Sequence, residues 1–306
     1  MTSVETRITP SDRAVEPLRL DRLLFGDNQF FGVNHMSEEK ARAQSMRFQD
    51  IAAVIEVLDA AHDEQVRSFM CTTHDRIAEV ADHVRAHPQR YRDQVFLPCM
   101  PYAHKYANAM TEDGPVGAIK RFLPDEGFLD AALRGGRSLA TKDIEGITTL
   151  LIDSEMKMFA GLSTPVVFLQ NVVVDLLLGL GFDEAFTIFA EHVRSRYGAE
   201  PGFITMNAPM LLPVLERLGI DDPVICANLN KVGFRMSGGI EAHRALLEQG
   251  RCRMIAMSVF ASGAIPPAEA IAWVCEQPNI SSIVFGASSR ANIASTRRLV
   301  EQLWTR

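Results

Sequence analysis

Short apolar runs alternate with longer amphipathic segments along most of the chain. About eight runs are rich in Val, Ile, Leu and Phe and apolar nearly throughout, as strands buried on both faces of a sheet are. The segments between them repeat apolar residues at helical spacing. Strands that alternate with helices predict βα units and a parallel sheet. The predicted strands lie within residues 22–28, 65–71, 94–100, 164–171, 201–207, 223–230, 252–260 and 281–289.

Two architectures agree with this pattern: a closed barrel and an open, doubly wound sheet. The length of 306 residues suits a (β/α)8 barrel, which typically needs about 250 residues. A doubly wound dinucleotide fold would place a GxGxxG turn after its first strand, and LLFGDNQFFG at 23–32 lacks that spacing. We therefore predict an α/β fold, a (β/α)8 TIM barrel, as one domain over 1–306 with an N-terminal extension at 1–21.

Two stretches need a separate interpretation. The run at 144–156, IEGITTLLIDSEM, is rich in β-branched residues, but Ile144, Ile147 and Leu151 recur at helical spacing, which predicts a helix from about 141 to 162. Residues 102–140 contain the turn-forming sequences EDGP, LPDEG and RGG. We expect them to form a long insertion after the third strand, placed as a lid over the mouth of the barrel.

Charge and composition narrow the classes of function. A net charge of −7 and a pI of about 5.7 argue against a surface for nucleic acid or an anionic membrane. The five cysteines form no CxxC pair and the first twenty residues lack an apolar signal core, which predicts reduced thiols in a cytoplasmic protein. The most apolar stretch, 164–182, contains Gln170, Asn171 and Asp175 and is a poor membrane span.

Polar side chains gather where the predicted strands end, which is where barrel enzymes place their catalytic and binding residues. Amides recur at these positions. They offer donors and acceptors without charge, which suits a carbonyl or hydroxylated ligand or the carboxamide of a nicotinamide. For any single residue, the simpler interpretation is that polar residues resume where a strand ends. We expect Asp27, Asn28, Thr73 and Asn171 to bind a small-molecule substrate.

The last part of the chain has a recognisable order of motifs. Residues 254–296 read MIAMSVFASGAIPPAEAIAWVCEQPNISSIVFGASSRANIAST: a strand that ends in a serine, a small-residue loop, a helix with an IAWV stretch, and a strand that runs into GASS. Upstream, PGFITMN and PVICANLNKVGFRMS follow the same order. This series resembles the aldo-keto reductases. The resemblance extends from about residue 22 to 300 and is weaker before 140.

The resemblance implies a cofactor, NADPH, bound without a Rossmann domain. Asn207 would contact the nicotinamide amide with Asn228 nearby, and Ser258 with the FASGA loop would lie along the pyrophosphate. The implied 2′-phosphate and adenine contacts are Ser288, Ser289, Arg290 and Asn292. Serine and arginine at a helix start supply donors and positive charge for a phosphate. The structural alternative is that GASSRAN is only a helix N-terminus capped by Ser289.

The catalytic motifs of the resembled family are replaced in this chain. That family has an Asp-Thr-Ala stretch with a tyrosine acid, a lysine on the third strand and a histidine on the fourth. Here FMCTTHDR at 69–76 has neither the aspartate nor the tyrosine in place, VFLPCMP has no lysine, and Asn171 stands where the histidine belongs. Fold and chemistry separate easily, so the barrel is still expected while ordinary carbonyl reduction is in question.

We therefore expect a substituted active site. His74 is the candidate proton donor, since an imidazole exchanges protons near neutral pH, and Asp75 either orients it or lies outside the site. Tyr102, His104 and Lys105 follow the third strand; a lysine there could lower a neighbour's pKa or form an imine. The competing explanation is that His74 only caps a helix that begins near Asp75, with Asp75 itself as the stronger cap.

A metal site is an alternative for the same region. His35, His74, His104 and Asp27 could converge, but the sequence has no HxH or HExxH spacing, and no metal is predicted. Cys71 and Cys99 are expected to be packed strand thiols. The other histidines, His62, His83, His87, His192 and His243, fall on helices or helix ends and are expected to face solvent.

Three functions remain open at this point. The first is an NADPH-linked oxidoreductase of aldo-keto reductase type, acting on a small polar carbonyl or hydroxylated compound. The second is a non-redox lyase, epimerase or hydrolase that uses His74, Lys105 or a metal. The third is a non-catalytic nucleotide-binding protein. The chemistry concentrated at 71–75 and 102–105 favours an enzyme, and assembly into a homo-oligomer is left open.

Overall fold

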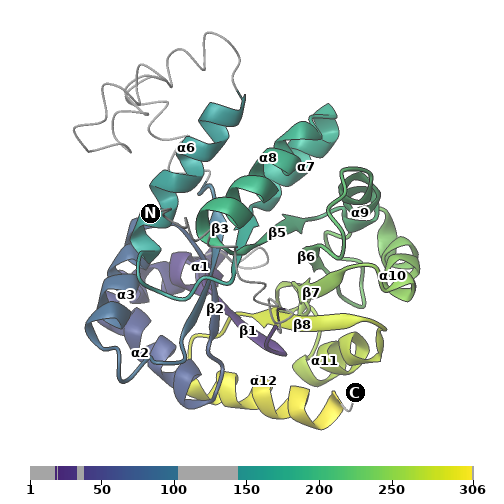
Figure 1. Ribbon diagram of the computed structural model, residues 1–306. Helices are drawn as coiled ribbons and strands as arrows, with labels where there is room; N and C mark the ends of the chain where they lie inside the picture. Colours follow the sequence, from purple (N-terminus) through teal and green to yellow (C-terminus); the bar gives the residue numbers. More distant parts are fainter. Residues whose placement is uncertain (1–17, 19, 33–37, 103–143, 305–306) are drawn as a thin grey trace, which may run out of the picture.

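Eight parallel strands close into a barrel in the order β1 to β8, as Figure 1 shows. The computed structural model describes residues 18, 20–32, 38–102 and 144–304. Each strand pairs with the next along the chain, and β1 also pairs with β8, which closes the sheet. The predicted (β/α)8 barrel is therefore confirmed. The strands are β1 (Leu23–Gly26), β2 (Ser68–Thr72), β3 (Val95–Met100), β4 (Val166–Leu169), β5 (Glu200–Thr205), β6 (Val224–Asn228), β7 (Arg253–Met257) and β8 (Ile280–Phe285).

The helices surround the barrel (Figure 1). Helix α6 confirms the helical interpretation of the stretch at 144–156, because it covers Ile144–Met156 and continues into η2 (Lys157–Phe159). Among the described residues, no helix is long and apolar enough to cross a membrane. The other helices are η1 (Asn28–Phe31), α1 (Glu38–Arg47), α2 (Ile51–Asp63), α3 (Asp75–Ala86), α7 (Asn171–Leu180), α8 (Glu184–His192), η3 (Val193–Tyr197), α9 (Ala208–Arg217), α10 (Gly239–Gln249), η4 (Ala261–Gly263), α11 (Pro267–Glu276) and α12 (Arg290–Leu303).

Two apolar clusters account for the nearly continuous hydrophobicity of the strands. Alternate strand residues point into the barrel and out toward the helices. The inner cluster includes Leu24, Met70, Leu97, Phe168 and Ile255, and Leu18 and Leu20 pack against it just before β1. The outer cluster joins the strands to the helices and contains most of the buried phenylalanines.

One glycine of the barrel interior is required by its neighbour. A Cβ atom at Gly202 on β5 would lie 2.4 Å from Cδ1 of Phe168 on β4, closer than any real contact. The ring of Phe168 is fully buried and fills the space that a side chain at position 202 would need. The chain therefore combines a large residue and a glycine on adjacent strands to fill this layer of the barrel.

Two expectations about histidines are wrong. His62 and His243 do not face solvent, because they are 8% and 1% exposed. Each lies on the side of its helix, α2 or α10, that packs toward the core, and burial lowers the pKa of both rings. The N-terminal extension at 1–21 and the insertion at 102–140 fall almost wholly outside the described residues, so the predicted domain division remains a prediction.

Candidate functional site

The C-terminal ends of all eight strands meet at one rim, here called the mouth, because the strands are parallel. The first carboxylate at the mouth is Asp27, which directly follows β1. Its side chain is 5% exposed, and Oδ2 accepts hydrogen bonds of 2.7 Å from both the backbone N–H and the hydroxyl of Thr72. Burial outweighs these hydrogen bonds and raises the pKa of Asp27 to about 6. This carboxyl group can therefore hold or release a proton near neutral pH.

A second buried carboxylate joins the loops that follow β2 and β3. Glu155 on α6 is 1% exposed and accepts a hydrogen bond from the hydroxyl of Thr73. Its Oε2 also accepts from the backbone N–H of Tyr102, at 3.2 Å. The carboxylate of Glu155 thus holds both Thr73, which follows β2, and Tyr102, which follows β3.

Sequence reasoning missed Glu155, although a signal was present. Leu151, Ile152 and Phe159 lie three or four positions away, and the last two are buried, so Glu155 is on the apolar face of its helix. A carboxylate at such a position is almost never fully buried unless it has partners. The conflict between residue type and helical face therefore pointed to a specific role.

A comparable carboxylate holds the end of β5. Oδ1 of Asp175 on α7 accepts from the hydroxyl of Thr205 at 2.5 Å, and Oδ2 accepts from the N–H of Met206 at 3.1 Å. Burial raises the pKa of Asp175. The hydroxyl oxygen of Thr205 in turn accepts from the N–H of Asn207. The strand ends β2 and β5 are thus both fixed by a threonine and a carboxylate from an adjoining element.

His74 lies within an aromatic cluster at the mouth, formed with Phe31 and Tyr102. The centroid of its ring is 4.5 Å from that of Phe31 and 5.3 Å from that of Tyr102. The guanidinium group of Arg76 lies over the ring of Phe31, with Cζ 5.5 Å from the ring centroid. Burial and the charge of Asp27 raise the pKa of Tyr102.

The backbone explains why His74 is held there. His74 is the N-cap of α3, and its Nδ1 accepts a hydrogen bond of 3.0 Å from the N–H of Arg76. Asp75, the first residue of the helix, is exposed. The capping interpretation of His74 is therefore confirmed, with His74 rather than Asp75 as the cap. Its catalytic role remains a prediction, and Lys105 and His104 lie outside the described residues.

The amides at the far side of the mouth are engaged within the chain. Asn207 caps α9, accepting from the N–H of Met210 at 3.3 Å. Asn228 donates to the carbonyl of Arg235 at 2.9 Å, and Asn230 makes two hydrogen bonds with the backbone of Phe234. These side chains shape the loop between β6 and α10. Asn28 is exposed at the start of η1, and Asn171 is the half-buried first residue of α7.

The loop after β7 is held in an uncommon backbone conformation. Ser258, Ala261 and Ser262 have φ values of 55°, 46° and 57°, in the left-handed region that non-glycine residues enter at a cost of about 1–3 kcal/mol each. The loop is the one that the resemblance places along a pyrophosphate. Local strain of this kind concentrates at ligand-binding segments.

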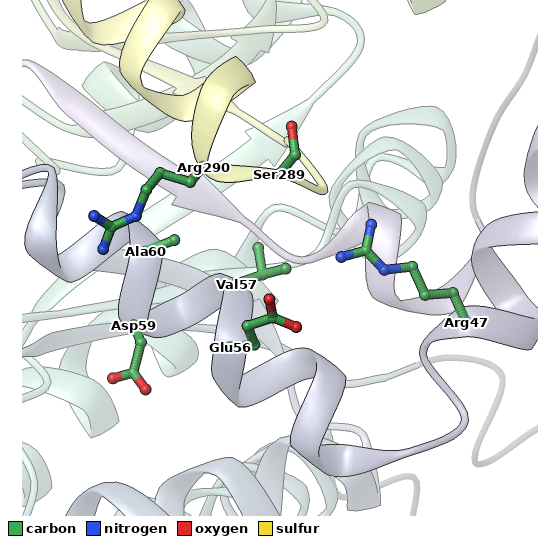
Figure 2. Close-up of a pocket in the computed structure, with 7 residues that line it drawn as sticks. All are labelled: Arg47, Glu56, Val57, Asp59, Ala60, Ser289 and Arg290. Carbon is green, nitrogen blue, oxygen red and sulfur yellow. The ribbon is translucent and has the colours of Figure 1, made fainter.

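A surface groove of about 420 Å³ lies between α2 and the N-terminus of α12 (Figure 2). Figure 2 shows Arg47 and Arg290 on opposite sides of the groove, with Ser289 between them. Ser289 caps α12 by accepting from the N–H of Asn292, and Arg47 donates to the carbonyl of Ser288 at 2.7 Å. Arg290 is paired with Asp63. The groove is lined by Arg47, Glu56, Val57, Asp59, Ala60, Ser289 and Arg290.

The groove is therefore lined by two of the residues that the sequence placed around a phosphate, Ser289 and Arg290, together with Arg47. It also contains the carboxylates of Glu56 and Asp59, so its charge is mixed. The capping interpretation of Ser289 is confirmed, and capping leaves the other donors of the helix N-terminus in place. Asn292 is exposed in the first turn of α12.

Metal ligands do not assemble in the part of the chain that the structure describes, where no group of three or more His, Cys, Asp or Glu side chains could hold a metal ion. Cys71 and Cys99 are free and buried, as expected for packed strand thiols. Burial raises the pKa of both thiols, which makes them poor nucleophiles.

The fold defines the chain as a (β/α)8 barrel, with buried polar side chains such as Asp27, Thr73 and Asn228 at its C-terminal rim. No family model matches the sequence, and no curated protein matches it.

Solved structures do match in shape. Two of them are structures from Pseudomonas aeruginosa that are assigned to the aldo-keto reductases. One has a TM-score of 0.58 at 13% identity, over 94% of this chain and 91% of that one. The other has a TM-score of 0.55 at 11% identity over 92% and 90%. A third is the thermostable aldo-keto reductase Tm1743 with the inhibitor epalrestat, with a TM-score of 0.54 at 12% identity over 96% and 93%. At these identities the likeness shows a shared fold, the fold that the sequence resemblance implied.

Proposed function

We propose that this protein is an NADPH-linked oxidoreductase of aldo-keto reductase type that reduces a small polar carbonyl compound, or oxidises the corresponding alcohol. The observation that carries the proposal is the groove at the N-terminus of α12. Arg47, Ser289 and Arg290 line it, beside the first turn of the helix that follows β8.

The residues of the groove suit a phosphate monoester. Arginine and helix N-termini are the usual partners of phosphate oxygens. Ser288, Ser289 and Arg290, with Arg47, would hold the 2′-phosphate, and the left-handed loop at 258–263 would follow the pyrophosphate. The carboxylates of Glu56 and Asp59 suit ribose hydroxyl groups as acceptors. They also weaken the attraction for phosphate, so affinity depends on the two arginines.

The mouth supplies what the reaction needs besides the cofactor, whose bound form provides a hydride. Reduction of a carbonyl adds a hydride to carbon and a proton to oxygen. Asp27 is the proton carrier in this proposal, because its buried carboxyl group has a pKa of about 6 and lies at the same edge of the mouth as Tyr102. The aromatic cluster of Phe31, His74 and Tyr102 provides an apolar wall that excludes water from the reacting carbonyl.

The test compares NADPH and NADH binding to Arg290→Ala, with Arg297→Ala as the matched control on the same helix. Arg297 is paired with Glu64 and Glu301 and does not line the groove. We expect Arg290→Ala to weaken NADPH binding about tenfold, or roughly 1.4 kcal/mol. The expected loss is modest because Arg290 would have to give up its ion pair with Asp63 when it binds the phosphate. NADH affinity and the control should be unchanged. Equal effects on both nucleotides would refute a 2′-phosphate site.

Turnover distinguishes the enzyme from the non-catalytic alternative. Binding of NADPH with oxidation of the nucleotide by a panel of small polar aldehydes and ketones supports the oxidoreductase. Binding without turnover across that panel favours a nucleotide-binding protein.

A further inference from the structure

Helix α7 directs its charged residue toward the protein and apolar side chains toward solvent. Its exposed residues are Val172, Leu176, Gly179 and Leu180. Asp175, the one charged residue of the helix, is half-buried and accepts hydrogen bonds from Thr205 and the backbone of Met206 at the end of β5. By contrast, the exposed residues of α3 are Asp75, Glu79, Asp82, Arg85 and Ala86. A surface helix usually has its charged residues on the solvent face, and a helix that is apolar all round is usually buried.

Three of the exposed side chains form a ridge along α7. Val172, Leu176 and Leu180 are four positions apart, so they lie one above the other on the same side of the helix. At a rise of about 1.5 Å per residue, the ridge is about 12 Å long. Gly181, with a left-handed backbone at φ 67°, ends the helix, and Phe182 follows it. These four apolar side chains are here called the α7 patch.

The exposed area of the α7 patch is large. Val172, Leu176, Leu180 and Phe182 are 56%, 58%, 62% and 48% exposed. At about 200 Å² for a large apolar side chain, the four expose about 450 Å² together. The largest apolar patch on a typical monomer covers about 300–600 Å² and is often functional. The α7 patch alone is therefore large enough to be the centre of an interface.

The α7 patch fits a second copy of itself. The one charge of α7 is bound within the chain, so the helix offers no charge that would select an acidic or basic partner. A two-fold axis near Leu176 would pair two helices antiparallel and place Val172 of each copy opposite Leu180 of the other. Such a pair would bury about 900 Å² from the two patches, more than half of a standard interface of about 1,600 Å².

We propose that the protein forms a homodimer through the α7 patch, with the two α7 helices antiparallel about a two-fold axis near Leu176. The patch begins next to Asn171 at the mouth, so the second copy lies at the edge of the mouth. Strands β4 and β8 are on opposite sides of the barrel, and α7 and α12, which follow them, lie on different sides of the molecule (Figure 1). The dimer therefore leaves the groove at α12 open, and this inference does not depend on the proposed function.

Sedimentation velocity of the full chain tests the association. The wild type should sediment as a species of twice the chain mass of 33.9 kDa. Leu176→Glu brings a carboxylate from each copy to the centre of the patch and should weaken the dimer at least about a hundredfold, because an unpaired charge is costly to bury. The control is Val232→Glu, at a side chain that is 59% exposed between β6 and α10, and it should remain dimeric. Circular dichroism checks that each variant is folded.

Cross-linking tests the arrangement without a charge in the patch. Leu176→Cys places a thiol near the two-fold axis, so a short bismaleimide, which alkylates two thiols, should join two chains. Val232→Cys should give no more cross-linked product than the wild type, whose five cysteines set the background. If Leu176→Glu does not fold, the cross-linking of Leu176→Cys decides alone.

Four results would overturn the proposal. A wild type that is monomeric at about 100 µM forms no dimer of useful affinity. A dimer that persists in Leu176→Glu, or that Val232→Glu disrupts equally, uses another surface. A dimer that Leu176→Cys does not cross-link has another arrangement. Binding of a monomeric wild type to phosphatidylcholine vesicles, lost in Leu176→Glu, would assign the α7 patch to a membrane surface instead.

Discussion

Substitution of Asp27 by Asn should make the protein more stable at neutral pH and less active. The carboxyl group is 5% exposed, and burial raises its pKa from 3.8 to about 6. Because the folded pKa is above the unfolded value, the folded state binds the proton more tightly than the unfolded state does. Stability from this group is present in full below about pH 4 and is lost as pH rises through 6.

The size of the effect follows from the two pKa values. A difference of about two units at 1.36 kcal/mol per unit corresponds to roughly 3 kcal/mol. The side chain of Asn cannot ionise, and its oxygen can still accept from Thr72. The stability of Asp27→Asn should therefore not fall in this way as pH rises.

Urea unfolding of both proteins between pH 4 and 8 measures the difference directly. The free energy of unfolding of Asp27→Asn minus that of the wild type should rise by about 2.4 kcal/mol between pH 4 and 7, most of the full difference. Asp221→Asn removes an exposed carboxylate and serves as the control for net charge, with no such rise expected. A difference that is the same at pH 4 and pH 7 would refute the argument from burial. Turnover with NADPH should fall in Asp27→Asn despite its greater stability.

Two further predictions concern the supports of the site and the barrel. Glu155→Ala removes the acceptor shared by Thr73 and the backbone of Tyr102 and should cost about 2–5 kcal/mol in urea unfolding, at about 1–3 kcal/mol for each stranded donor; a cost below 1 kcal/mol would mean that water replaces the carboxylate. Gly202→Ala should cost about 1–3 kcal/mol by overpacking, because the new Cβ would lie 2.4 Å from Phe168. Its control, Gly179→Ala, meets nothing within 4 Å on α7 and should stabilise by about 0.5–1 kcal/mol; equal effects of the two would contradict the packing argument.

The barrel could be predicted from the sequence because each of its elements carries its own local signal. Runs such as VVFL at 166–169 are apolar on both faces, which only a strand between two apolar layers requires. The helix at 144–156 was distinguished from a strand by the spacing of its apolar residues alone. Closure between β1 and β8 has no local signal. It was predicted from the length of the chain and the number of βα units.

Individual side-chain roles at the mouth were less accessible to sequence reasoning. Asn228 was expected to lie near the nicotinamide, because amides at strand ends suit such a ligand. In the structure it binds the backbone of Arg235, and the nearby Asn230 binds that of Phe234, since short amides compete well for nearby backbone groups. The path of the loop that presents those groups cannot be read from the pattern. Arg47 was missed for a related reason, because it reaches the α12 groove from a distant part of the chain.

His74 shows a structural role that the sequence had offered as one of two alternatives. The alternatives were capping and proton transfer. The structure shows the cap, in which Nδ1 accepts from the backbone N–H of Arg76, and proton transfer by His74 remains a prediction.

The measurement that tests the central claim most directly is a titration of the wild-type protein with NADPH and with NADH, followed by nucleotide fluorescence. The groove with Arg47, Ser289 and Arg290 predicts saturable binding of NADPH, at least tenfold tighter than that of NADH, which corresponds to about 1.4 kcal/mol for the contacts of the extra phosphate. The preference should weaken at high salt, because the contacts are charged and partly exposed. Absence of binding by either nucleotide at millimolar concentration would contradict the account.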